Sequence, residues 1–321
     1  MISIVLTTHN GEKYIIEQLE SIINQSLKPN EILIGDDNST DATLDLIINY
    51  LKNNSIKFYI DDKDYIKDGG SLIIRIFKNN TNIGFNKNFI KKKKKTAYDI
   101  IFISDQDDLW YKDKIKTQYN LLISKNAICV SSNYDLENNN DKELKELSFQ
   151  EISIKNINHI SFYGMTMCFR KDKEFLSFIE YMLKDTSYLY YDRLFTLYFI
   201  IKGKVYLINN PLVYHRIHDL NVVGNNTKNI RGSLEDRVKI AYDYYNDIEF
   251  IKKHINNISD STLFYLNINE NFRYKRYLLL NELNNNNTIN NKIKLFIFIL
   301  TNFINYPYTK SIFGDLYYNF K

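Results

Sequence analysis

The sequence has few of the features that mark secreted or membrane-spanning proteins. It contains only two cysteines, Cys129 and Cys168, both within apolar strand-like runs, which is typical of buried reduced thiols in a cytoplasmic protein. Its first residues lead into a strand pattern without the basic flank and small-residue cleavage site of a signal peptide. The longest candidate for a spanning segment, at 293–300 and interrupted by Lys294, is shorter than the about 20 residues that a spanning helix needs. We therefore expect a cytoplasmic protein, either soluble or peripheral on the inner face of the cytoplasmic membrane.

Two phosphate-binding glycine motifs are also missing. No G-x-G-x-x-G follows the first predicted strand, and G-x-x-x-x-G-K-[ST] occurs nowhere, which disfavours dinucleotide-binding and NTP-hydrolysing folds of those kinds. The net charge of +4 is too small to indicate a nucleic-acid partner. We interpret the lysines at 91–95 and the asparagines at 284–287 as solvated loops or helix faces, because the whole sequence is rich in both residue types.

The first third of the chain alternates between strand and helix patterns. Unbroken β-branched runs predict central strands of a parallel sheet, covered on both faces. Apolar residues at helical spacing predict helices at 15–26 and 44–51. Such strand–helix–strand units form sheets that bind ligands at the carboxyl ends of their strands. The predicted strands cover 2–7, 31–35, 56–60, 72–77 and 100–104.

Three carboxylates follow the last of these strands, in Asp105-Gln106-Asp107-Asp108, and the only tryptophan, Trp110, comes next. Neighbouring carboxylates repel one another, so they are tolerated best when exposed or when a hard cation neutralises them. A divalent ion held by one or two of them would keep positions open for diphosphate oxygens and stabilise charge on a leaving nucleotide. The alternative is an acidic turn in solvent.

Two earlier strands end in hydroxyl, amide and carboxylate groups. The segments are Thr7-Thr8-His9-Asn10 and Asp36-Asp37-Asn38-Ser39. A carboxylate can accept a hydrogen bond from the ring N–H of a base, and hydroxyls can bind its edges. The alternative for 36–39 is a turn that caps the following helix.

In this order and spacing, the segments resemble the family 2 glycosyltransferases. The family's [ST]-x-[YH]-N turn, D-D-[GN]-S-x-D segment, N-x-G segment and D-x-D signature match 7–10, 36–41, 82–84 and 105–108. The D-Q-D-D-x-W form is similar to the rhamnosyltransferase-type branch. The agreement covers about 115 residues and continues more weakly to Gly224.

The resemblance implies an α/β protein with the GT-A fold, a mainly parallel open sheet flanked by helices. It also implies an inverting transfer from a UDP-, dTDP- or GDP-sugar with Mg²⁺ or Mn²⁺. By position, Thr7 and Asp37 would contact the base, Asp105 the ribose, and Asp107 the metal ion. Asn10 and Asp36 would support these residues without acting directly. Asn82 is the remaining donor-site position.

An inverting transfer needs a base that takes the acceptor hydroxyl proton. In this branch, the base is typically an Asp after His or Glu at the start of a helix, and the matching position is Asp192, preceded here by Tyr191. Asp185 is the second candidate. The alternative for Asp192 is an acid that stabilises a helix N-terminus through the helix dipole.

Two further segments match acceptor-side and strand elements of the family. In 164–170, Thr166 would hydrogen-bond the donor sugar. In 211–218, Arg216 would offset diphosphate charge, and His218 would complete the metal site or contact the pyrophosphate. Strand alternation predicts that Arg216 and His218 share a face and that His215 points the other way.

We predict a glycosyltransferase domain at 1–230, with a nucleotide-binding half at 1–125 and an acceptor half at 126–230. A helical region at 231–321 follows, with helices at 234–254, 263–283 and 289–304. Aromatic residues and lysines in its last part fit either an interfacial membrane helix or a homodimer contact.

The expected function is sugar transfer to a saccharide or lipid-linked acceptor in bacterial surface polysaccharide synthesis, such as O-antigen or capsule. Two alternatives stay open. A nucleotidyltransferase can share an open sheet and an acidic metal site, but it would need a basic Gly-rich loop near the first strand. A catalytically inactive scaffold that binds nucleotide-sugars is favoured if the base lies far from the metal site.

Overall fold

The predicted alternation of strands and helices is present in the structure, a computed structural model. It describes residues 1–61, 72–138, 146–157, 160–185, 190–218, 233–306 and 309–320. The chain divides into two compact units. The first unit comprises Met1–Ile152, Phe162–Asp185 and Lys202–Arg216, and the second comprises Ser153–Ser161, Thr186–Ile201 and Ile217–Lys321.

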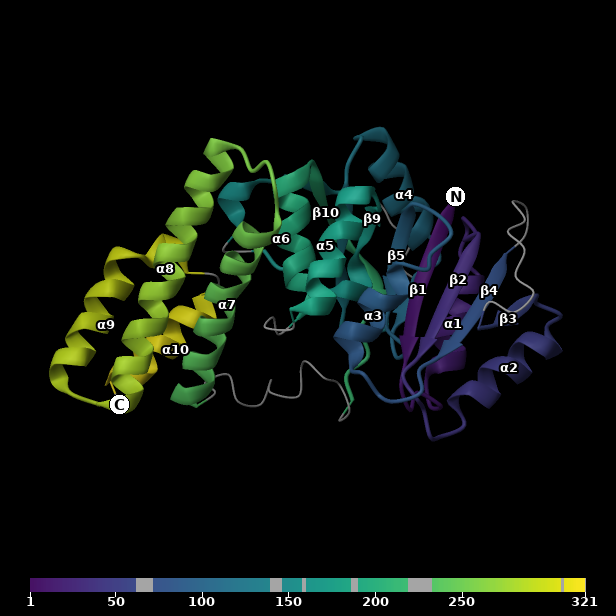
Figure 1. The fold of residues 1–321 in the computed structure, drawn as a ribbon, viewed down its shortest axis with the longest axis horizontal. Helices are drawn as coiled ribbons and strands as arrows, with labels where there is room; N and C mark the ends of the chain where they lie inside the picture. Colours follow the sequence, from purple (N-terminus) through teal and green to yellow (C-terminus); the bar gives the residue numbers. More distant parts are fainter. Residues whose placement is uncertain are drawn as a thin grey trace. The chain divides into compact units, whose positions relative to one another are not determined.

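The strands of the first unit form one sheet in the order β3-β4-β2-β1-β5-β9-β7-β10-β6, and β8 pairs with β10 (Figure 1). The first five strands of this order run parallel, β9 is antiparallel to both of its neighbours, and β10 is parallel to β7. The strand bounds are β1 (Ile2–Thr8), β2 (Glu31–Asp36), β3 (Phe58–Ile60), β4 (Ile73–Lys78), β5 (Ile100–Ser104), β6 (Leu109–Trp110), β7 (Cys129–Asp135), β8 (Phe149–Ile152), β9 (Cys168–Arg170) and β10 (Val205–Tyr214).

Helices cover both faces of the parallel part of the sheet. Every residue of β1, β2 and β5 is buried, as their unbroken apolar runs predict. Chain order moves from β1 to β2 in one direction and from β4 to β5 in the other, so right-handed crossovers place the intervening helices on opposite faces. Leu6 of the sheet packs in one core cluster with Leu19, Ile47 and Ile115 from three helices. The helices of this unit are α1 (Ile15–Ile23), α2 (Thr43–Asn53), α3 (Phe85–Lys93), α4 (Lys114–Ser124) and α5 (Lys173–Lys184).

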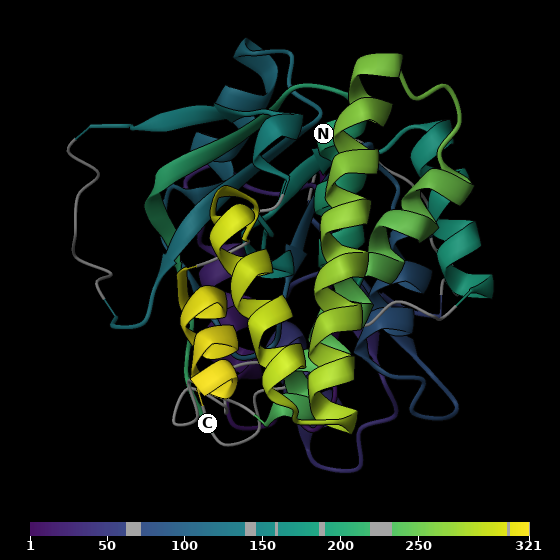
Figure 2. The same cartoon turned by 90° about the vertical axis from the view of Figure 1, so that its left-hand side faces the viewer.

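The second unit is helical and has its own core. Figure 2 shows α8, α9 and α10 side by side, in yellow-green to yellow. Phe272 and Leu280 pack there with Leu295 and Phe298. Among the described residues, no helix combines the length and apolar character needed to cross a membrane. The helices are α6 (Tyr191–Lys202), α7 (Leu234–His254), α8 (Asp260–Asn285), α9 (Ile289–Thr301) and α10 (Thr309–Phe320), with a 3-10 turn η4 (Phe303–Asn305).

The division into units differs from the predicted domain boundary at residue 230. The segments 153–161 and 186–201 cluster with the C-terminal helices and not with the sheet. One cause is an ion pair between Arg193 of α6 and Asp247 of α7, whose side chains are both nearly inaccessible to solvent. A sequence pattern shows that α6 is a helix but does not show which partner its buried charge will find.

Candidate active site

The loops after β1 and β5 lie where the order of the parallel strands reverses. β1 pairs with β2 on one side and with β5 on the other. In open α/β sheets, ligands bind at the carboxyl ends of the strands at such a switch point. Thr7 near the end of β1, Asn10 in the following turn and Asp105 directly after β5 are all at this place. The fold thus brings together three residues that the sequence predicts to bind the donor.

Gln106 of the acidic loop ties that loop to the turn after β1. Thr8 Oγ1 donates a hydrogen bond to Gln106 Oε1 at 2.7 Å, and the backbone N–H of His9 donates to the same oxygen at 2.9 Å. Gln106 Nε2 donates in return to the His9 carbonyl at 3.1 Å. A Cβ on Gly11 would lie 2.2 Å from Gln106 Oε1, so this arrangement requires glycine there. The two loops are held as one structure.

Asp36 and Asn10 connect the turn after β1 to the turn after β2. The fully buried Asp36 carboxylate accepts hydrogen bonds from the backbone N–H of Ser39, at 3.0 Å, and from its hydroxyl. Ser39 Oγ in turn accepts from the Asn10 N–H at 3.0 Å. Asn10 has a left-handed φ of 48°, which asparagine tolerates, and its Oδ1 accepts from the Thr40 N–H at 2.9 Å. Both side chains thus stabilise the loops.

Asp37 organises the loop between β4 and α3. Its carboxylate accepts three hydrogen bonds, from Asn79 Nδ2 at 2.8 Å, from the Ile83 N–H at 2.9 Å and from the Gly84 N–H at 2.8 Å. Gly84 has a φ of 84°, which only glycine adopts at little cost. A carboxylate can accept about four hydrogen bonds, so Asp37 has capacity for one further donor.

Asn82 lies in the same loop, at its exposed rim. Its Oδ1 accepts a hydrogen bond from the Gly84 N–H at 2.9 Å, and its Nδ2 is 3.1 Å from His9 Nε2. The loop after β4 therefore contacts the turn after β1 directly. The segments 7–10, 36–39, 82–84 and 105–108 form one hydrogen-bonded group, which we call the donor-loop cluster.

Lys92 stabilises this cluster through Asn79, the residue that donates a hydrogen bond to Asp37. Its Nζ donates to Asn79 Oδ1 at 3.2 Å, and the side chain is only 3% exposed. Burial, together with the charges of Lys95 and Lys91, lowers the pKa of Lys92 to about 8. The prediction of a solvated face at 91–95 is therefore wrong for Lys92 and Lys93, because both pack their long stems inside the first unit.

The acidic loop holds two half-buried carboxylates, Asp105 and Asp107, and one fully buried carboxylate, Asp108. Asp108 Oδ1 lies 2.7 Å from Nδ1 of His215. Burial raises the pKa of Asp108, and the hydrogen bond and charge of His215 oppose that rise. Burial would lower the pKa of His215, but Asp108 first, and then the charges of Asp105 and Asp107, raise it.

Strand alternation is not a guide to the side chains that follow β10. β10 shifts register at Pro211 and ends at Tyr214, so strand alternation does not extend to His215, Arg216 and His218. His215 turns toward Asp108 of the acidic loop, whereas Arg216 turns toward α1. The shared face of Arg216 and His218 stays a prediction. The sequence carries no local signal for this contact, because the two partners are 107 residues apart.

Arg216 contacts α1. Its Nη2 donates to Glu17 Oε2 at 2.6 Å, and its guanidinium lies 4.5 Å from the centre of the Tyr14 ring. The Glu17 side chain is 59% exposed, so this ion pair is weak and screened by solvent. A stronger anion could therefore compete for the guanidinium.

Thr166 is buried at the edge of the acceptor-side strands, with only 1% exposure. Its hydroxyl donates to the Tyr163 carbonyl at 2.7 Å and lies 2.7 Å from Ser131 Oγ. The structure thus gives this side chain two interior partners, and its contact with the donor sugar stays a prediction.

The acidic loop fits a divalent ion for which it supplies only part of the coordination. Within the described residues, no three His, Cys, Asp or Glu side chains group closely enough to enclose a metal ion by themselves. Mg²⁺ and Mn²⁺ bound with nucleotides need only one or two carboxylates, because phosphates and waters complete their coordination. Asp105 and Asp107, each half-buried after β5, supply such a donor set.

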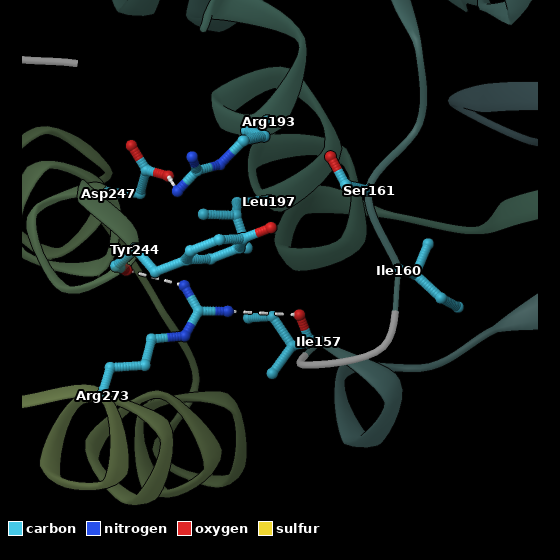
Figure 3. A pocket seen from close by; sticks show the side chains of 8 residues that line it. All are labelled: Ile157, Ile160, Ser161, Arg193, Leu197, Tyr244, Asp247 and Arg273. Carbon is cyan, nitrogen blue, oxygen red and sulfur yellow. Dashed lines mark hydrogen bonds and ion pairs between the residues drawn. The ribbon is translucent and has the colours of Figure 1, made fainter. Parts of the chain in front are cut away.

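Asp192 and His218 belong to the second unit, whereas Asp185 belongs to the first. Asp192 lies in the first turn of α6, and the α6 start is fixed by Arg193, which pairs with Asp247. Figure 3 shows the guanidinium groups of Arg193 and Arg273 on opposite sides of the Tyr244 ring. Their Cζ atoms lie 3.7 and 5.1 Å from the centre of the ring. These contacts join α6 to α7 and α8.

The family profile described as Glycosyl transferase family 2 matches residues 3–179, more than half of the chain. The chain belongs to glycosyl transferase family 2. The matched range contains the whole donor-loop cluster. The family resemblance predicted from the sequence is thereby confirmed.

Two bacterial glycosyltransferases are similar in sequence to part of this chain. The sequence is 40% identical over 131 residues to a dTDP-rhamnosyl transferase, RfbG, of Shigella flexneri, and this match covers 40% of each chain. It is 24% identical over 153 residues to WfgD of Escherichia coli, a UDP-Glc:alpha-D-GlcNAc-diphosphoundecaprenol beta-1,3-glucosyltransferase, covering 48% of this chain and 53% of WfgD. The chain thus spans about half or less of the length of these relatives.

Solved structures share the fold. TarS of S. aureus (residues 1–349, with UDP-GlcNAc) superposes with a TM-score of 0.55 at 19% identity, over 88% of this chain and 72% of that one. A mannosyltransferase of Pyrobaculum calidifontis, in complex with GDP-Man and Mn²⁺, gives a TM-score of 0.54 at 14% identity, over 99% and 84%. The predicted GT-A fold with a C-terminal helical part is confirmed.

Proposed function

We propose that the chain is an inverting glycosyltransferase that moves a sugar from a nucleoside-diphosphate sugar to a saccharide or lipid-linked acceptor. The donor-loop cluster is the observation that carries this proposal. It gathers Asp37, Asp105 and Asp107 at the carboxyl ends of parallel strands, in a chain of family 2. We further propose that the transfer takes place in the cytoplasm, in the synthesis of bacterial surface polysaccharide.

In this proposal, the cluster binds the nucleotide. Asp37 accepts a hydrogen bond from the base at its remaining acceptor position, beside Thr7, and Asp105 binds the ribose. Asn10, Asp36 and the other loop contacts keep these groups in place before the donor arrives. Preorganised polar groups of this kind lose little entropy on binding.

Asp107 would hold Mg²⁺ or Mn²⁺, which supplies electrostatic stabilisation for the diphosphate leaving group. Arg216 could exchange Glu17 for a diphosphate oxygen, because the Glu17 side chain is 59% exposed. His218 is proposed as a further contact to the metal ion or the pyrophosphate. His215 orients Asp108, the buried carboxylate of the same loop.

We propose Asp192 as the base that accepts the proton of the acceptor hydroxyl as that oxygen attacks the anomeric carbon. The carbon–oxygen bond to the diphosphate breaks on the opposite side, and the configuration inverts. Arg193, through Asp247 and Tyr244, fixes the α6 turn that carries Asp192. A general base of this kind contributes about 10²- to 10⁴-fold to a rate.

The choice of sugar follows from two observations. The D-Q-D-D-x-W segment is similar to the rhamnosyltransferase-type branch, and the Shigella relative that is 40% identical is named a dTDP-rhamnosyl transferase. We therefore propose a deoxyhexose such as rhamnose as the first donor sugar to test, followed by hexoses on UDP and GDP.

The first experiment separates donor binding from general stability. Purified protein is melted with a panel of nucleotide-sugars with and without Mn²⁺, and nucleotide release is measured on the same samples. A donor at about 100 times its Kd stabilises the native state by about 2.7 kcal/mol. We expect the Mn²⁺-dependent stabilisation and donor hydrolysis to be lost in Asp107→Ala and kept in Asp99→Ala, which changes an exposed Asp at the other end of β5. Equal loss in both variants would contradict the assignment of Asp107.

The second experiment identifies the base. Asp192→Asn should keep donor binding and reduce transfer by on the order of 10²-fold or more. Asp185→Asn serves as the matched comparison, and loss of transfer there alone would move the role to Asp185. Wild-type protein that binds a donor but transfers sugar to no acceptor would favour the scaffold alternative.

A further inference from the structure

Helix α9 has two apolar faces. One face packs into the core of the second unit through Leu295, Phe298 and Ile299, all of them buried. The other face is exposed, although apolar residues on a surface helix normally face the core only. Its residues recur three or four positions apart, as one row of a helix requires, and each is more than half exposed. Together with the following turn, they form a row that we call the α9 ridge: Ile289, Ile293, Ile297, Leu300, Phe303 and Ile304.

Helix α10 extends the apolar surface. The ring of Phe320 lies 5.8 Å from that of Phe296 on α9, so the two helices meet beside the ridge. Phe313 and Phe320 are seven residues apart, on one face of α10, and are 68% and 74% exposed. An apolar surface built from two neighbouring elements is more than a scattered exposed side chain, and it indicates an interaction site.

The chain segment that carries the ridge has charges of one sign only. No Asp or Glu occurs between Leu283 and Gly314, whereas this stretch contains Lys292, Lys294 and Lys310. A helix turns by about 100° per residue, so Lys292 and Lys294 lie on either side of α9, between its buried and its exposed faces. Lysines at such positions extend along apolar surface and present their ammonium groups beside it.

A groove between α8 and α9 adds polar groups at the same edge. It has a volume of about 390 Å³, and its lining includes Lys275 and Lys294 together with Asn302 and Asn305. Lys294 donates to Glu282 at 3.3 Å, but both side chains are 48% exposed. Such an exposed pair is worth little, so Lys294 can exchange Glu282 for a phosphate.

We propose that the α9 ridge is a membrane-docking surface that inserts into the interface of a bilayer containing anionic lipids. The ridge enters the boundary between headgroups and acyl chains, while the lysines on both sides bind lipid phosphates. Apolar insertion combined with positive charge is the pattern of helices that lie on a membrane without crossing it.

A second copy of the chain fits the ridge less well. A symmetric dimer would place the ridge against itself, so that the lysines of one protomer faced those of the other. The stretch between Leu283 and Gly314 supplies no carboxylate to pair with them, and the adjacent Glu282 is already paired with Lys294 of its own chain. An anionic leaflet offers the complementary charge, and for this reason we commit to the membrane.

Vesicle flotation tests the proposal with the full chain and without any sugar donor, so its outcome is independent of the proposed transfer. Vesicles of phosphatidylglycerol mixed with phosphatidylcholine are compared with vesicles of phosphatidylcholine alone. We expect wild-type protein to float with the anionic vesicles and much less with the neutral ones. Replacing Lys292 and Lys294 by Gln should weaken binding to the anionic vesicles by roughly fivefold per lysine.

The double variant Ile297→Ser/Leu300→Ser removes apolar surface from the ridge and should weaken vesicle binding by about tenfold or more. Its matched control is Leu46→Ser/Ile123→Ser, which changes two exposed apolar residues of the first unit and should bind like wild type. Thermal melts show whether each variant keeps its fold. Unchanged binding of the ridge variant, or no binding by wild type, overturns the proposal. A concentration-dependent dimer that the ridge variant abolishes also overturns it, because the occupant would then be a second copy.

Discussion

Each unit of the molecule buries a carboxylate, but the two carboxylates have different partners. In the second unit, Asp315 of α10 accepts hydrogen bonds from Arg237 Nε of α7 and Arg276 Nε of α8, each at 2.8 Å. Burial alone would raise the pKa of Asp315, but the charges of Arg276 and Arg237 outweigh it and lower the pKa. In the first unit, Asp108 has one imidazole, His215, and burial raises its pKa.

The two carboxylates therefore have different roles. Asp315 stabilises the packing of helices, whereas Asp108 positions a loop of the candidate active site. Two permanently charged guanidinium groups more than compensate Asp315, and they join three helices into one unit. Asp108 pairs with a titratable imidazole and accepts a further hydrogen bond from the Arg216 backbone, and the charges of Asp105 and Asp107 also act on that imidazole. Weaker compensation beside a binding loop is typical of functional sites, where stability is given up for a specific arrangement of charges.

The largest effect should come from breaking the structural cluster. Asp315→Asn leaves two arginines buried without a counter-charge, and we expect a loss of about 3–5 kcal/mol in the free energy of unfolding of the second unit. Urea denaturation measures this loss. Glu282→Gln, which removes an exposed pair in the same unit, should cost less than about 1 kcal/mol. If both variants had equal stability, the buried cluster would not be a major source of stability.

A second, intermediate effect should appear in activity. Asp108→Asn and His215→Gln each remove one partner of the hydrogen-bonded pair that Asp108 of the acidic loop forms with His215. We expect each to weaken Mn²⁺ binding, measured by electron paramagnetic resonance, and sugar transfer by about 10- to 100-fold. Because the two residues act together, the double variant should be little worse than the poorer single variant. Additive losses would show that each residue acts through separate contacts.

The smallest effect concerns Lys114, a fully buried lysine near the same loop. Its Nζ donates to Gln118 Oε1 at 2.6 Å and lies 4.8 Å from the centre of the Trp110 ring, and burial lowers its pKa to about 7. Between that folded-state value and the ordinary value of 10.5, the unfolded chain holds more protons than the folded one. Stability from this group should therefore rise with pH through that window and be lost as pH falls toward 7.

Urea denaturation of wild type and Lys114→Met at several pH values tests this dependence. We expect wild type to gain about 1–2 kcal/mol between neutral and mildly alkaline pH, relative to a variant that lacks the titrating group. Parallel curves for the two proteins would show that Lys114 does not titrate in this range.

Much of the fold could be predicted from the sequence because its signals are local. The unbroken apolar runs at β1, β2 and β5 require burial on both faces, and a parallel sheet provides it. Helix α7 begins and ends where predicted, since Ser233 and Asp236 form a capping box at its start. The position of the acidic loop could also be predicted, because ligands bind at the carboxyl ends of the strands in such sheets.

The contacts within the site could not be predicted, because they join residues distant in sequence. Gln106 is 97 residues from His9, and Arg193 of α6 pairs with Asp247 of α7, 54 positions further along the chain. The contact of His215 with Asp108 could not be predicted because the two residues lie 107 positions apart. The lysine run at 91–95 looked uniform, yet helix periodicity buries Lys92 and Lys93 and leaves Lys91 exposed. Composition alone cannot separate such neighbours.

The hydrogen bonds of Gln106 have a consequence for engineering and for the divergence of related enzymes. The turn at 7–10 and the acidic loop share one amide side chain, and Gly11 must remain small to admit it. A segment transplanted from a relative to change nucleotide preference would lose its anchor unless residue 106 came with it. The two loops therefore have to be exchanged together, although 93 residues separate Gly11 from Asp105 in the sequence.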